Sequence, residues 1–149
     1  MKLNKIIAAI GVATALTLPG ISSAALDTDS ATVSMSVGLY ASLTGLDNFV
    51  LSPSSTNGAA GSIYSGSDTF NLESNGQVRV SLSGGDLSNG SDSVTTTYEM
   101  DDDGVTFDTT ASSIHNANHS VSASAELGDI SSQKAGSYSS TITITVSAI

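Results

Sequence analysis

Apolar and polar side chains alternate with a period of two along several stretches of the chain, a pattern typical of β-strands with one buried face. The longest stretch has apolar residues at every odd position from Ala31 to Leu43, with Ser or Thr at most positions between them. The most regular stretch lies near the C-terminus, from Tyr138 to Val146, where Ile142, Ile144 and Val146 alternate with threonine. No stretch after the first 25 residues shows helical periodicity, so we expect an all-β protein.

Further strands are expected around residues 70–82, 94–109 and 119–127, where the same alternation recurs between clusters of Gly, Ser, Asn and Asp. Residues 52–68 are rich in Ser, Gly and Ala and predict a long loop with at most a short strand near Ile63. Seven or eight strands with short polar links and no intervening helices predict an immunoglobulin-like antiparallel β-sandwich.

Two turns predict hairpins. A three-residue loop at Asn75 would place Leu72 opposite Val78, although an arch that joins two different sheets is an alternative there. A second hairpin is expected across the acidic turn at 101–104, because that pairing places every apolar residue of both strands on one face.

The first 25 residues predict a cleavable signal peptide. Lys2 and Lys5 are followed by an uncharged apolar stretch, then by Pro19, Gly20 and a run of small residues. The apolar stretch is shorter than the ~20 residues that a membrane span needs, so we favour a signal peptide over a retained anchor. Residues 26–149 are then expected to form a single domain without membrane insertion. We expect the protein to be exported, transiently to the periplasm and then to the cell surface or outside.

The charge balance is strongly acidic. The chain carries a net charge of −10 and has no cysteine, and removal of Lys2 and Lys5 with the signal peptide takes the charge to −12. A polyanionic surface repels phosphate backbones and anionic headgroups, so nucleic acid and membrane-surface partners are disfavoured. Cations are the favoured small partners.

The acidic turn is a candidate cation site. Three adjacent carboxylates repel each other, and Asp101 and Asp103 could bind calcium together with backbone carbonyls near Gly104. An ordinary solvated turn is the other interpretation. We expect no other cofactor.

Catalysis is not expected from the remaining chemistry. His115 and His119 would form a zinc pair on a helix, but here they lie where a loop enters a strand, and no cysteine or nearby carboxylate completes a ligand set. The chain also lacks a Gly-x-Ser-x-Gly elbow and an identifiable pair of glycosidase carboxylates.

The C-terminal half resembles the spore coat protein U domain and the related archaic chaperone–usher pilins. The similarity lies in four pieces that occur in the expected order: residues 77–85, 97–107, 120–130 and 135–146. The resemblance implies an immunoglobulin-like subunit that lacks one strand and polymerises by accepting a strand from a neighbour, with a periplasmic chaperone and an outer-membrane usher as partners. Such strand addition combines main-chain hydrogen bonds with pockets for alternate side chains.

The resemblance also suggests which residues assemble. A donated strand would comprise residues 31–37, with Gly38 as a hinge and 39–43 as the subunit's own first strand. The donor and groove residues would be Val33, Met35 and Val37, and Ile142, Ile144 and Val146, respectively. The alternative, which we favour slightly from the sequence, is that 31–43 is one long kinked strand of a complete sandwich.

Three functions remain open. The first is a secreted structural subunit of a surface fibre, coat or biofilm matrix that assembles through strand edges with copies of itself or sister subunits. The second is a calcium-dependent adhesion or glycan-binding module. A small secreted hydrolase is the least favoured, because no catalytic constellation is recognisable.

Overall fold

The computed structural model describes residues 27–111, 114–129 and 133–149, and the signal peptide predicted for residues 1–25 lies outside them. The chain divides into two units, one ending at Ser36 and the other spanning Val37–Ile149. In the first unit, residues 27–36 have no regular secondary structure. No helix in the described part of the chain is long and apolar enough to cross a membrane.

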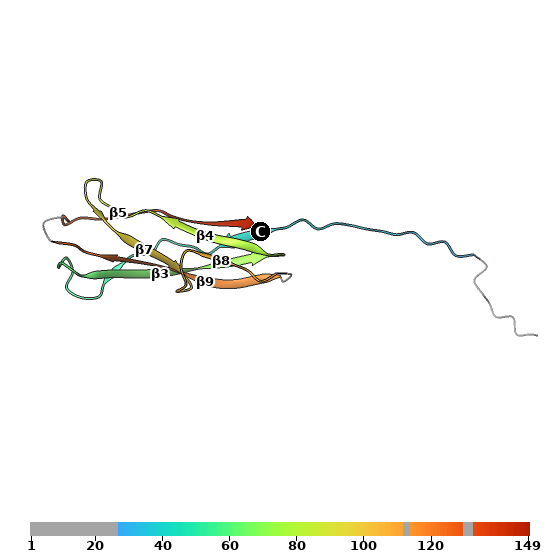
Figure 1. Ribbon diagram of the computed structural model, residues 1–149, viewed down its shortest axis with the longest axis horizontal. Helices are drawn as coiled ribbons and strands as arrows, with labels where there is room; N and C mark the ends of the chain where they lie inside the picture. The colour runs from blue at the N-terminus through green and yellow to red at the C-terminus, as the bar shows by residue number, and fades with distance from the viewer. Residues whose placement is uncertain (1–26, 112–113, 130–132) are drawn as a thin grey trace, which may run out of the picture. The chain divides into compact units, whose positions relative to one another are not determined.

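The second unit is built from antiparallel strands in two main sheets (Figure 1). The first sheet has the order β1 (Ala41–Thr44), β3 (Ile63–Ser74), β9 (His115–Glu126), β7 (Thr96–Met100), and β2 (Ser52–Pro53) also pairs with β3. The second sheet has the order β10 (Ile142–Ala148), β4 (Val78–Gly84), β8 (Thr106–Asp108). A small pair is formed by β5 (Leu87–Ser88) and β6 (Ser93–Val94).

The core lies between the two sheets. Phe70 and Leu72 of β3 belong to one buried cluster with Val78 and Val80 of β4, and these four side chains are at most 1% exposed. Burial of each such side chain contributes about 1.5–3 kcal/mol to the free energy of folding. The predicted all-β antiparallel sandwich is confirmed.

Both predicted hairpins are wrong, because the chain changes sheet at each turn. β3 belongs to the first sheet and β4 to the second, so the turn at Asn75 is an arch. The acidic turn likewise joins β7 of the first sheet to β8 of the second. Alternation alone does not separate the two arrangements, because a hairpin and an arch both direct the apolar side chains into the same core.

Two strand predictions also need correction. Residues 31–43 do not form one long strand, since the first strand is only Ala41–Thr44. The long loop predicted for 52–68 ends earlier, because β3 begins at Ile63. Gly66 in β3 allows the backbone of Val50 to approach closely: a Cβ there would lie 2.6 Å from the Val50 carbonyl oxygen. Gly66, one of the small residues that suggested a loop, thus allows two backbones to pack closely.

Candidate assembly groove

The outer edge of β10 is the longest open strand edge in the described part of the chain. β10 pairs with β4 along seven positions, from Ile142 to Ala148, and has no strand on its other side. The outer edge of β7 is shorter, with five residues, and at its first residue Thr96 N donates to Asp86 Oδ1 at 3.0 Å and Leu87 N donates to Thr96 Oγ1 at 3.1 Å. An open edge of seven residues without a charged side chain is a template for strand pairing.

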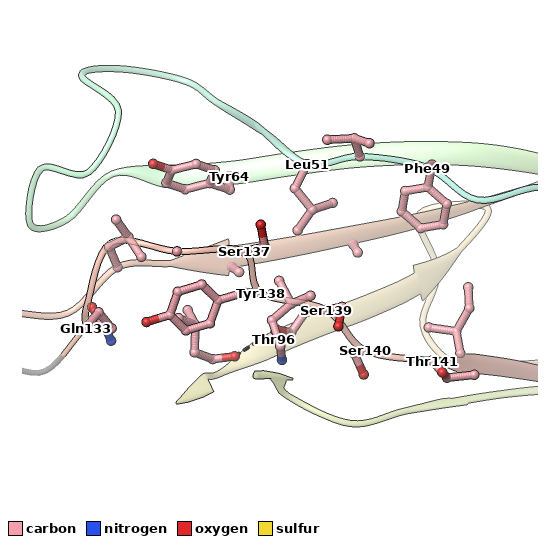
Figure 2. Close-up of a pocket in the computed structure, with 18 of the residues that line it drawn as sticks. Phe49, Leu51, Tyr64, Thr96, Gln133, Ser137, Tyr138, Ser139, Ser140 and Thr141 are labelled. Carbon is pink, nitrogen blue, oxygen red and sulfur yellow. Dashed lines mark hydrogen bonds between the residues drawn. The ribbon is translucent and has the colours of Figure 1, made fainter. Parts of the chain in front are cut away.

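A groove of about 1220 Å³ opens beside the start of β10. Its two walls are the extended segments 46–51 and 133–142, which face each other across the opening (Figure 2). Its floor includes Ala123 and Ala125 of β9. Protein interiors are normally close-packed, so alanines below a wide opening leave room for the large side chains of an added segment.

The groove has an apolar end and a more polar end. Phe49 and Leu51 supply apolar surface at one end, whereas Tyr64 and Tyr138 line the other end (Figure 2).

The hydroxyl groups of both tyrosines already have partners within the body. Gly58 N donates to Tyr64 Oη at 2.8 Å, and Tyr138 Oη donates to the Lys134 carbonyl at 2.9 Å. A segment entering this end therefore meets mainly ring surface.

The residues predicted for the groove lie on one face of β10. Ile142 lines the open groove, and Ile144 and Val146 continue the row, half-buried against the core. The structure therefore brings these three side chains together on the strand with the open edge.

The residues predicted for the donor are strongly exposed. The side chains of Val33, Met35 and Val37 are 95%, 89% and 73% exposed. Their alternation with Ser34 and Ser36 leaves one face of the segment apolar and the other polar.

The groove walls were not identified from the sequence. Segment 46–51 lacks regular alternation. The pattern predicts residues 138–141 as the start of the last strand, whereas β10 begins only at Ile142 and these residues line the groove. The only available signals were the apolar run Phe49–Leu51 and the isolated aromatic Tyr138.

The candidate calcium ligand Asp101 is engaged with β9. Its Oδ2 lies 2.6 Å from His119 Nδ1, and its Oδ1 accepts a hydrogen bond from Ser120 N at 2.8 Å. Asp103 lies in the same turn, where its backbone N donates to the Met100 carbonyl at 2.9 Å. Among the described residues, no group of three or more His, Asp or Glu side chains is placed to hold a metal ion.

The electrostatics of Asp101 follow from these contacts. Partial burial acts to raise the pKa of Asp101, but the hydrogen bonds from His119 and Ser120 outweigh it and hold this pKa below its ordinary value. Asp101 and Asp102 have positive φ angles of 49° and 60°, which Asp tolerates better than most residues. Asp101 thus secures a left-handed turn against the middle of β9.

The two histidines do not form a metal pair. They are four residues apart on the extended strand β9, a separation of about 13 Å. His115 Nε2 lies 3.1 Å from the Thr110 carbonyl oxygen, and the His119 ring stacks on Phe107 with centroids 4.5 Å apart. The His119 ring is therefore part of the packing of the sandwich, and the His115 ring contacts the backbone at Thr110.

A further exposed ion pair lies on the second sheet. Arg79 Nε and Asp108 Oδ1 are 2.7 Å apart, and Arg79 Nη2 donates to Asp108 Oδ2 at 2.8 Å. The hydrogen bond from the Arg79 guanidinium lowers the pKa of Asp108. This pair joins β4 to the short edge strand β8.

No protein-family model matches the chain, and no curated protein is significantly similar to it. The function is therefore inferred from the groove, the open edge and the exposed segment.

Proposed function

We propose that this chain is a structural subunit of a surface fibre, coat or matrix, and that copies assemble by strand donation. Residues 31–37 of one copy enter the groove of the next and pair with the open edge of β10. The supporting observation is that one chain carries both complementary parts: a groove beside an unpaired strand, and an exposed segment with alternating apolar side chains.

The alternation of the segment matches the chemistry of the site. In an added strand, Val33, Met35 and Val37 would point into the sandwich, and the serines between them would continue the outer polar row of Thr143 and Thr145. Burial of each apolar side chain is worth about 1.5–3 kcal/mol before the cost of ordering the segment. Met35 is suited to an irregular groove because its side chain is unbranched and flexible.

The positions of the two parts favour an open chain of subunits. Residue 40 is bonded to the turn at Asn75, where β3 ends, whereas the groove is lined by Tyr64 at the start of β3. The two sites are thus separated by most of the length of β3, which is 12 residues. A contact between two different surfaces at opposite ends of a subunit is heterologous. Such a contact builds an open head-to-tail chain of subunits and not a closed dimer.

The same features support export and escorted assembly. An apolar groove and an exposed apolar segment would promote indiscriminate association before assembly, which a chaperone partner would prevent. The predicted signal peptide and the resemblance to archaic chaperone–usher pilins agree with this route. We therefore propose the periplasm as a transit compartment and the cell surface or exterior as the destination.

The proposal is tested by a substitution in the donor segment with a matched control next to it. We expect Met35→Asp to abolish SDS-resistant ladders and filaments, because a charge would be placed in the apolar groove. Ser34→Asp should retain them, because its side chain would stay on the outer face. Gel electrophoresis without boiling and electron microscopy of the purified exported protein give the readout.

Two results would contradict strand donation. A wild-type protein that stays a monodisperse monomer at high concentration would contradict the proposal, as would equal effects of the two substitutions. A synthetic peptide of residues 27–40 should also shorten the polymers in a dose-dependent way by filling grooves. A peptide of the same composition without the alternation should have no effect.

A further inference from the structure

One side chain fixes the point at which the N-terminal segment leaves the sandwich. Asn75 Oδ1 accepts a hydrogen bond from Tyr40 N at 2.7 Å, and Asn75 Nδ2 donates to the Gly38 carbonyl at 2.9 Å. Asn75 N and Ser74 Oγ both donate to the Tyr40 carbonyl at 3.1 Å. We call these contacts between the turn and residues 38–40 the Asn75 clamp.

Packing supports the clamp at Leu39. A Cβ placed on Gly76 would lie 2.9 Å from Leu39 Cδ1, so a glycine at this position lets the leucine approach the turn closely. Residues 38–40 are therefore held to the body and do not behave as a free linker.

The clamp fixes the end of the body at which residues 38–40 lie. β1 begins with Ala41 opposite Ser74 and runs away from the turn, so residues 40 to 38 lead off the body at this end. β10 finishes at the same end, because Ala148 pairs with Val78. The open groove lies toward the other end of β10, beside Ile142.

Two kinds of insertion are compatible with these positions. A segment that turned back at Gly38 into its own groove would run parallel to β10, whereas a segment from a second copy entering at the far end would run antiparallel to it. Length does not prevent self-insertion, since residues 31–37 match the seven residues of β10. Insertion into the groove of a second copy, and not into a copy's own groove, must therefore be favoured by a feature other than the length of the segment.

On the basis of the proposed function, we propose that the Asn75 clamp selects assembly between copies over closure of a copy on itself. By holding residues 38–40 in line with β1, it opposes the reversal at Gly38 that self-insertion requires. Asn75 is thus a positioning residue for strand donation, and it acts through the backbone of the donor.

The test compares cross-links within and between copies. Ser34→Cys and Thr145→Cys place two unique thiols on the outer faces of the donor and of β10, because the chain has no cysteine of its own. Copies labelled with light and heavy nitrogen are mixed unfolded, refolded together and treated with a bifunctional thiol reagent. Mass spectrometry of the linked peptides then gives the ratio of intrachain to interchain links.

We expect Asn75→Ala in this background to raise that ratio about tenfold, because two side-chain hydrogen bonds are lost. The matched control is Asn71→Ala, which removes amide hydrogen bonds to Asn116 and Asn118 on the outer face and does not touch residues 38–40. It should leave the ratio unchanged. In Asn75→Ala with Met35→Asp, the intrachain links should disappear again.

The outcomes separate the clamp from the function on which it rests. If the ratio of intrachain to interchain links is the same in Asn75→Ala and Asn71→Ala while interchain links still form, the role proposed for the Asn75 clamp is wrong. Strand donation between copies would remain supported. A lack of interchain links in every variant, with no effect of the 27–40 peptide, would overturn strand donation itself. If Asn75→Ala does not fold, Asn75→Asp keeps the acceptor for Tyr40 N and loses the donor to Gly38, and a ratio equal to the control would again overturn the clamp.

Discussion

At the scale of single residues, Asp101 combines an unusual backbone conformation with contacts that hold it in place. Its positive φ would strain most side chains, and its carboxylate is held by His119 and Ser120 in the middle of β9. The acidic turn that suggested a cation site is thus also a structural junction between β7 and β9. The sequence could not reveal this, because Asp101 and His119 are 18 positions apart and meet only through the arch.

We predict that Asp101→Asn lowers stability at neutral pH by about 1 kcal/mol, because the contact is partly exposed and screened by solvent. Since the pKa of Asp101 is lowered in the folded state, its contribution is complete above the ordinary aspartate pKa of about 3.9 and is lost as the pH falls through the lower folded value. Urea unfolding at pH 7 and at pH 2–3 measures this. The difference between wild type and Asp101→Asn should shrink in acid.

Asn is the informative replacement because it tolerates the left-handed conformation that Asp101 adopts. Asp101→Ala should cost more, since it adds backbone strain to the lost contacts. A pH-independent difference between wild type and Asp101→Asn would contradict the assigned role.

At the scale of elements, alternation predicted where strands occur but not which sheet each strand joins. The rows of Phe70 and Leu72 and of Val78 and Val80 were recognised as inward-facing, and all four residues are buried. The choice between hairpin and arch depends on how two twisted layers close over the core, which is a property of the whole domain. Coil segments such as 46–51, which form a groove wall, have no periodic signal at all.

We predict that Gly66→Ala destabilises the fold by about 1–3 kcal/mol and loosens the groove wall, because the added Cβ would collide with the Val50 carbonyl. Ser67→Ala, at the next and exposed position of β3, is the control and should have little effect. Urea unfolding measures the free energy of unfolding. The affinity for the 27–40 peptide shows whether the groove wall formed by residues 46–51 has moved. Unchanged stability in Gly66→Ala would show that segment 49–51 is not held against β3.

At the scale of the whole molecule, the proposed assembly would have to bring strongly acidic bodies together. Only Arg79 and Lys134 are basic after the predicted signal peptide, against fourteen carboxylates in the chain. The groove lining includes Asp47 and Lys134, but most of its side chains are uncharged, and residues 31–37 carry no charge. Long-range repulsion therefore opposes encounter, whereas the final contact depends little on charge.

We predict that polymerisation accelerates as sodium chloride is raised from 10 to 150 mM, because the screening length falls from about 30 Å to about 8 Å. Light scattering after dilution from denaturant follows the rate. Slower assembly at higher salt would indicate an electrostatic rather than an apolar contact. Matched ionic strength with calcium chloride shows whether a divalent cation has an additional effect.

The opposite placement of donor exit and groove mouth has a mechanical consequence for a fibre built in this way. Tension along the fibre axis would load the inserted strand in shear, so that all of its hydrogen bonds with β10 resist together and none can be peeled off one at a time. Each junction would then tolerate a large pulling force even though its equilibrium affinity rests on a few side chains. Such a fibre would suit an attachment that must survive flow.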